Sequence, residues 1–162
     1  MNKAIELTQT QIKAYENGST IFLFTIDTKL KMSEIGLIKD LIQFSPVQKG
    51  DKDIFVQEEF NCVGDCNFGM PCQNCGSNGQ GIGIFKASQM TKEQSRYSFN
   101  ECIDVRVVRV QDIEYKDLCK MRLLKKAYWQ QDIQFAYNQQ LKEQNINRTY
   151  EDNDYVFLVE FA

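Results

Sequence analysis

The longest strand pattern in the chain is Ser98-Phe99-Asn100-Glu101-Cys102-Ile103-Asp104-Val105-Arg106-Val107-Val108-Arg109-Val110. Polar and apolar side chains alternate along most of it, and a period of two predicts a strand with one face toward a core. The runs at residues 19–26 and 155–161 are apolar on both faces for much of their length. Such runs favour strands inside a sheet, so we expect both of them at inner positions.

The rest of the chain alternates shorter strand and helix signals. Thr8 and Gln11 have the spacing of a capping box, which predicts a helix over residues 8–17. Residues 33–44 predict a short helix, and residues 117–144 predict one long amphipathic helix or two. A turn at Gln48–Asp51 leads into a strand at 53–60, and another strand is expected at 81–86. This pattern predicts an α+β fold: a small closed or half-closed β-barrel of about six strands with peripheral helices, in a single domain over residues 1–162.

The composition excludes several classes of function. The chain has 162 residues, with 19 basic and 22 acidic side chains and a formal net charge of -3. This balance disfavours strong non-specific binding to nucleic acid. The chain has no histidine, which excludes imidazole-based triads and histidine-ligated catalytic zinc. No apolar run is long enough for a signal peptide or a membrane span, so we expect a cytoplasmic protein without membrane contact.

Four cysteines form the strongest local signal. Cys62, Cys66, Cys72 and Cys75 lie within a glycine-rich stretch that has few large apolar residues. Four thiolates are the tetrahedral donor set that Zn²⁺ prefers, and they leave no open position for water. The sequence therefore predicts a structural zinc site in a loop insertion at 61–80, with an iron–sulfur cluster or free redox thiols as the alternatives. Cys102 and Cys119 lie outside this cluster and are expected to be small apolar core residues.

Four stretches together resemble a known family. They are the helix followed by Asn17-Gly18-Ser19-Thr20, the Lys49-Gly50-Asp51 turn with the strand Ile54–Phe60, the segment from Ala87 through Ser95-Arg96 and the strand Glu101–Ile113, and the closing strand Asn153–Phe161. They are similar to the ASCH domain of the PUA-like superfamily, and in particular to bacteriophage-encoded ASCH-like proteins. The resemblance implies a β-barrel with a ligand cleft beside the first strand and a role in binding RNA or a modified nucleoside.

Some ASCH proteins are amidohydrolases, but the residues at two of their positions differ here. Thr20 and Leu23 stand where those enzymes have Lys and Thr, and residues 21–24 are Ile-Phe-Leu-Phe where phage members carry arginines. The sequence therefore favours a binding module over an enzyme. If the protein is encoded by a phage, its location would be the host cytoplasm.

The candidate ligand residues come from these matched stretches. They are Asn17, Ser19, Thr20, Glu58, Glu59, Ser95, Arg96 and Tyr155. Arg96 can hold a phosphate or stack on a base, a carboxylate can accept from an exocyclic amine, and an aromatic ring can stack. Five of them have a structural alternative: one of the two glutamates faces solvent or pairs with an arginine, Arg96 ties two loops together, and Ser19 and Thr20 satisfy backbone groups.

Three functions follow as hypotheses. The first is a zinc-stabilised module that binds RNA or a nucleotide-like small molecule. The second is hydrolysis of a modified nucleoside by a rearranged site in which Glu58 or Glu59 is the general base. The third is a small phage protein that binds and inhibits a host protein.

Overall fold

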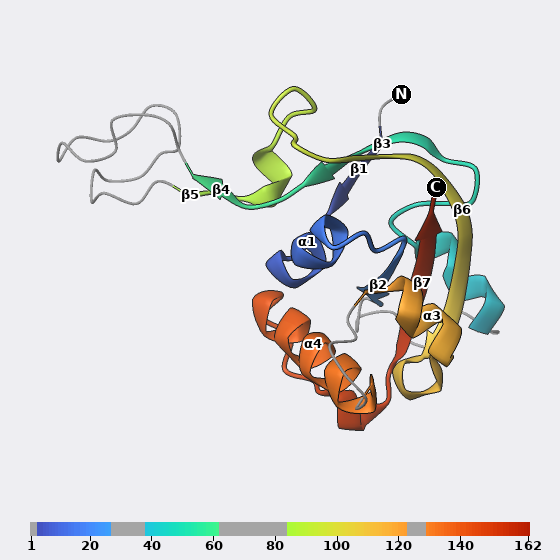
Figure 1. Cartoon of the computed structure of the whole chain (residues 1–162). Coiled ribbons are helices and arrows are strands. Elements are labelled where there is room, and N and C mark those ends of the chain that lie inside the picture. Colours follow the sequence, from blue (N-terminus) through green and yellow to red (C-terminus); the bar gives the residue numbers. More distant parts are fainter. Residues whose placement is uncertain (1–2, 27–37, 62–83, 123–128) are drawn as a thin grey trace, which may run out of the picture.

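The computed structural model describes residues 3–26, 38–61, 84–122 and 129–162 (Figure 1). Its strands are β1 (Lys3–Glu6), β2 (Ile21–Thr25), β3 (Lys52–Gln57), β4 (Phe60–Asn61), β5 (Ile84–Phe85), β6 (Ser98–Arg109) and β7 (Tyr155–Phe161). Its α-helices are α1 (Gln9–Glu16), α3 (Tyr115–Lys120) and α4 (Trp129–Glu143). Short 3-10 segments are η1 (Ile38–Phe44), η2 (Ala87–Gln89), η3 (Val110–Asp112) and η4 (Tyr150–Asp152).

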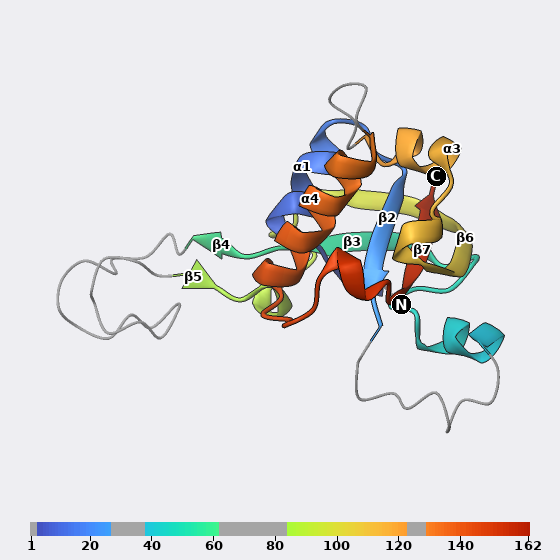
Figure 2. The same ribbon diagram turned by 90° about the horizontal axis from the view of Figure 1, so that it is seen from below.

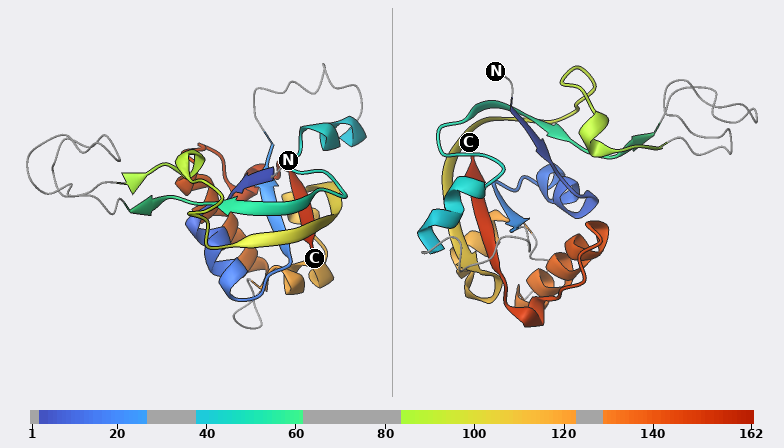
Figure 3. Two further views of the ribbon diagram at one scale, coloured as in Figure 1. Left: turned by 90° about the horizontal axis from the view of Figure 1, so that it is seen from above. Right: turned by 180° about the vertical axis from the view of Figure 1, so that it is seen from behind.

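The main sheet has five strands in the order β1-β3-β6-β7-β2. Only the β1–β3 pair is parallel; the other three pairs are antiparallel. The first part of β6 pairs with β3, the rest pairs with β7, and the register shifts between Cys102 and Asp104. The long strand therefore belongs to both halves of the sheet, and it curves around the body of the protein (Figures 1 and 3).

The fold is α+β as expected, but the sheet is open. Among the described residues β1 and β2 are its two edges and do not pair with each other. A closed six-stranded barrel is therefore not formed by the part of the chain that the structure describes.

Both faces of the inner strand β7 are buried, which confirms the expectation for residues 155–161. Phe157, Val159 and Phe161 belong to one core cluster, which also holds Ile12 and Phe99. Val156 and Leu158 belong to a second cluster, built with side chains of α3 and α4. Alternate side chains of β7 thus pack into two cores, one on each side of the sheet.

The strand at 19–26 is also present, as β2, but its expected inner position is wrong. In the part of the chain that the structure describes, β2 pairs only with β7 and is an edge of the sheet. Its side chains are nevertheless buried on both faces, with Phe22 in one core and Leu23 in the other. Helices α1 and α4 lie side by side along this edge (Figures 1 and 2). These helices cover β2 on the side where we had expected a neighbouring strand.

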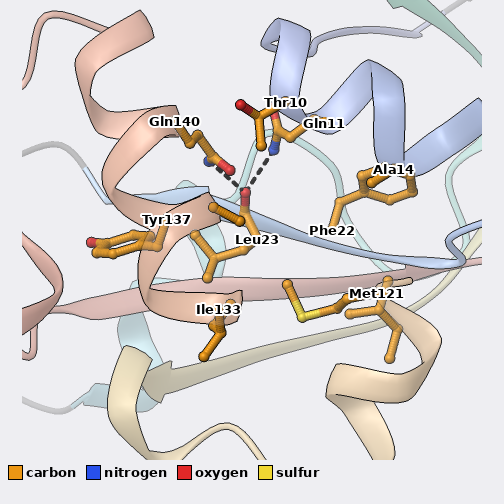
Figure 4. A pocket seen from close by; sticks show the side chains of 11 residues that line it. Thr10, Gln11, Ala14, Phe22, Leu23, Met121, Ile133, Tyr137 and Gln140 are labelled. Carbon is orange, nitrogen blue, oxygen red and sulfur yellow. Dashed lines mark hydrogen bonds between the residues drawn. The ribbon is translucent and has the colours of Figure 1, made fainter. Parts of the chain in front are cut away.

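Two glutamines satisfy the backbone at this covered edge (Figure 4). The side-chain amides of Gln11 and Gln140 both donate to the carbonyl oxygen of Leu23, at 2.7 and 2.9 Å. Both glutamines are buried. A buried edge carbonyl needs a donor when no further strand provides one, and these two side chains replace the missing strand.

The expected helices are largely confirmed. Thr8 caps α1 with the predicted capping box, in which the Gln11 amide N–H donates to Thr8 Oγ1 at 3.3 Å and the Thr8 amide N–H donates to Gln11 Oε1 at 2.9 Å. The segment 117–144 contains two helices, α3 and α4, and residues 123–128 lie outside the described residues. From the helix expected at 33–44, residues 38–44 form the 3-10 segment η1, and 33–37 also lie outside.

Beyond the main sheet, β4 and β5 form a two-stranded ribbon that leads away from the body (Figures 1 and 3). Phe60 pairs with Phe85 and Asn61 with Ile84, and the two phenyl rings stack with centroids 4.6 Å apart. The ribbon therefore places Asn61 and Ile84, which flank segment 62–83, next to each other. In the described parts of the chain, no helix combines the length and the apolar character needed to cross a membrane.

Candidate ligand site

The fold brings Glu58 and Arg96 into contact. Glu58 directly follows β3, and Arg96 lies two residues before β6. Because these strands are antiparallel, with Phe55 opposite Ser98, the end of one lies beside the start of the other. Arg96 Nε donates to Glu58 Oε1 at 2.8 Å, and Arg96 Nη2 donates to the same oxygen.

The two partners of this ion pair differ in burial. Glu58 is only 4% exposed, because it continues the buried face of Ile54 and Val56 along β3. The side chain of Arg96 is 58% exposed. The hydrogen bond to Glu58 raises the pKa of Arg96, so the guanidinium remains protonated beside this carboxylate.

The second carboxylate oxygen of Glu58 is unsatisfied. Oε2 is buried and accepts no hydrogen bond from any residue that the structure describes. A buried polar atom without a partner costs about 1–3 kcal/mol, and more when it is charged. Such an atom beside an exposed arginine marks a position where a ligand donor would lower the free energy.

Two tyrosines that we had not selected from the sequence complete the surroundings of Arg96. Its guanidinium carbon lies 4.9 Å from the centroid of the Tyr97 ring, which lies 4.6 Å from the Tyr15 ring. Tyr15 Oη donates to the carbonyl of Ser98 at 3.0 Å, which fixes the Tyr15 ring against the start of β6. The adjacent Arg-Tyr pair before a strand is the sequence signal that could have identified Tyr97.

Ser95 has a structural role in this arrangement. Its hydroxyl donates to the carbonyl of Val56 at 2.6 Å, with the Tyr97 carbonyl 2.8 Å away as a second acceptor. The Val56 amide in turn donates to the Tyr97 carbonyl at 2.9 Å. Ser95 thus ties the segment that carries Arg96 to β3.

The other candidates near the first strand do not join Glu58 and Arg96. Asn17 is the C-cap of α1 and lines a cleft between α1 and α4. Ser19 is buried and donates to the carbonyl of Ile21 at 2.7 Å. The Thr20 backbone accepts from the Phe161 amide and donates to the Lys120 carbonyl. For Ser19, the side-chain contact is that of the structural alternative, whereas the bonds of Thr20 are made by its backbone.

Glu59 and Tyr155 are directed to other parts of the molecule. Glu59 is exposed and lines a separate cleft of about 470 Å³ together with Glu6 and Glu143. Tyr155 pairs with Arg109 at the far end of β6, and the Arg109 guanidinium carbon lies 4.4 Å from its ring centroid. A twelve-residue strand separates Tyr155 from Arg96. Of the eight candidates, the structure therefore gathers Glu58, Ser95 and Arg96.

The predicted zinc ligands Cys62, Cys66, Cys72 and Cys75 lie outside the described residues. Elsewhere, within 3–26, 38–61, 84–122 and 129–162, no group of three or more histidine, cysteine or acidic side chains could hold a metal ion. Cys102 is buried, as expected, whereas Cys119 is half-buried.

Comparison with protein-family models, with curated proteins and with solved structures finds no match to this chain.

Proposed function

We propose that the protein is an ASCH-like, zinc-stabilised module that binds RNA or a nucleotide-like ligand at the corner formed by Glu58, Arg96 and Tyr97. The observation that carries this proposal is the unsatisfied Oε2 of the buried Glu58. The strongly curved sheet, with α1 and α4 along its open edge at β2, is compatible with a half-closed PUA-like barrel.

The three side chains offer complementary contacts to a nucleobase. A carboxylate accepts from the exocyclic amine or ring N–H of a base. The exposed guanidinium of Arg96 can stack on a base or grip a phosphate, and the Tyr97 ring adds a stacking surface. Glu58 is engaged by Arg96, and Thr20 and Leu23 replace the Lys and Thr of the amidohydrolases. We therefore propose binding rather than hydrolysis.

The test is a thermal-shift series with the four ribonucleosides and a short single-stranded RNA. A ligand that binds only the folded state raises the Tm once its concentration exceeds the Kd. We expect a Tm increase with at least one probe, and we expect Arg96→Ala to abolish that increase. Arg148→Ala is the matched control, because Arg148 also pairs with a carboxylate, that of Asp154.

Each shift is measured against the variant's own Tm without ligand, so a loss of stability does not mask a loss of binding. The proposal fails if no probe raises the Tm, or if Arg96→Ala keeps the full increase.

Zinc is the second part of the proposal. Cys62, Cys66, Cys72 and Cys75 would hold the ion, since four thiolates suit tetrahedral Zn²⁺ and complete its coordination. The pairing of Asn61 with Ile84 supports this arrangement, because it brings together the two residues that flank the cysteine segment. Bound zinc would order that loop and take no part in ligand chemistry.

Native mass spectrometry of the chain purified without chelator tests the metal directly. We expect one Zn²⁺ per chain, its loss in Cys62→Ser, and its retention in Cys119→Ser, which removes a cysteine outside the cluster. A mass that corresponds to the metal-free chain, or to an iron–sulfur cluster, would refute the zinc assignment.

A further inference from the structure

The cleft between α1 and α4, which Asn17 lines, is a second candidate site. It has a volume of about 410 Å³, within the range of small-molecule sites. From α1 it is lined by Thr10, Lys13, Ala14 and Asn17, whose spacing places them on one helix face. Tyr15, which contacts the Glu58–Arg96 corner through Tyr97, lies on the opposite side of the same helix. The cleft is therefore separate from the site proposed above.

Two cations, Lys13 and Arg122, line this cleft. Lys13 and Arg122 are exposed, and their side chains form no ion pair or hydrogen bond in the part of the chain that the structure describes. This is notable because Asp132 and Glu143 line the same cleft. The carboxylate of Glu143 instead accepts from the amide and hydroxyl of Thr10, at 3.2 and 3.0 Å.

The backbone of Arg122 has an unusual conformation. Its φ is +53°, in the left-handed region, directly after the C-cap of α3. The other described non-glycine residues with positive φ are Asp53, Asn145 and Asn153, whose short polar side chains tolerate this region. Glycine is the usual residue at such a helix end. An arginine here is held at a conformational cost, and strained residues of this kind are enriched at ligand sites.

An aromatic ring and two amides complete the lining. Phe135 is 74% exposed, the highest value among the exposed large apolar side chains of the described residues. Asn17 and Gln139 supply side-chain amides, which can pair with the donor and acceptor edge of a base. We infer that this cleft is a second ligand site for a small aromatic anion of the nucleoside monophosphate class. Lys13 and Arg122 would hold the phosphate, and the base would stack on Phe135.

The experiment is isothermal titration calorimetry of the full chain with adenosine monophosphate, with adenosine and inorganic phosphate as partial ligands. We expect binding of the monophosphate and at least tenfold weaker binding of each part. Lys13→Ala and Phe135→Ser should each weaken binding several-fold. Lys49→Ala, which removes an exposed cation that does not line the cleft, should leave the affinity unchanged.

Arg122→Gly separates binding from folding. Glycine relieves the positive φ, so we expect a Tm equal to or above that of the wild type, together with a several-fold loss of affinity. No binding of the monophosphate, or unchanged affinity in both Lys13→Ala and Arg122→Gly, would overturn the inference. Binding that is lost in Arg96→Ala but kept in Lys13→Ala would assign the ligand to the Glu58–Arg96 corner and would also overturn it.

Discussion

Glu58 carries a charge in the interior, and Arg96 balances only part of it. One carboxylate oxygen accepts both arginine contacts, while the other has no donor among the described residues. Removal of one partner from such a pair leaves an uncompensated charge, which costs more than the pair itself contributes. Because Arg96 is largely exposed, solvent screens the pair and reduces this cost.

A double-mutant cycle measures this imbalance. We expect Arg96→Ala to lower the free energy of unfolding by about 1–2 kcal/mol, because it leaves the Glu58 carboxylate without a partner. Adding Glu58→Gln should restore at least half of that loss, since an uncharged amide is buried in place of the charge. Urea unfolding provides both values. Strictly additive losses in the double variant would contradict this account.

At the scale of elements, β2 owes its burial to helices. The Leu23 carbonyl on its outer edge accepts from one glutamine of α1 and one of α4. Gln11 also accepts from the Thr8 amide, so the same side chain caps α1 and links it to the sheet. The two-sided apolar pattern of residues 21–24 predicted burial correctly. It could not distinguish a covering strand from covering helices, because both remove the same side chains from water.

The two glutamines should be coupled. Gln140→Ala leaves one donor on the Leu23 carbonyl and should cost about 1 kcal/mol of unfolding free energy. Gln11→Ala should cost more, because it also removes half of the capping box. The double variant leaves the carbonyl without a side-chain donor, so its loss should exceed the sum of the single losses. Urea unfolding of the three variants decides this, and a purely additive result would show that the shared carbonyl is unimportant.

The turn before β3 predicts a pH dependence. Burial raises the pKa of Asp51, but the hydrogen bond from the Gln48 amide at 2.7 Å and the Lys3 ammonium at 2.9 Å outweigh it and hold the pKa below its ordinary value. The folded state therefore favours the charged carboxylate. This stabilisation is complete above the unfolded-state pKa of about 4 and disappears as the pH falls through the folded-state pKa.

We expect Asp51→Asn to lower the free energy of unfolding by about 1 kcal/mol near neutral pH. The difference from the wild type should start to shrink below about pH 4, where the unfolded-state carboxylate becomes protonated, and should vanish once the pH lies below the lower folded-state pKa. Asp53→Asn, a change of the same kind at an exposed neighbour, is the matched control. Urea unfolding over a series of pH values tests both variants, and a constant difference down to acidic pH would contradict the assignment.

At the scale of the whole molecule, the sequence predicted the elements better than their arrangement. The sequence allowed one of the two glutamates to pair with an arginine, but the partner of Glu58 lies 38 residues away, and only the antiparallel pairing of β3 with β6 joins them. Tyr155 was misplaced for the same reason: its position depends on the length of β6. Tyr97 was overlooked because its role comes from the rings around it, which belong to other elements.

The body of the protein should fold without the cysteine segment. The core clusters of the described residues are built from the main sheet and its helices, and Asn61 and Ile84 are already paired. Replacing residues 62–83 by an Asn-Gly turn should therefore keep a cooperative unfolding transition, with a Tm within a few degrees of the wild type. Loss of the transition in this variant, measured by circular dichroism, would show that the segment is part of the main core.

The central claim is that the Glu58–Arg96 corner binds a nucleotide-like ligand, and the most direct measurement is a heteronuclear NMR titration of the full chain with ribonucleosides and a short RNA. We predict that the Arg96 side-chain Nε–H signal shifts together with the backbone amides of residues 57–58 and 95–97. Shifts confined to other regions, or no shifts at saturating ligand, would contradict the claim.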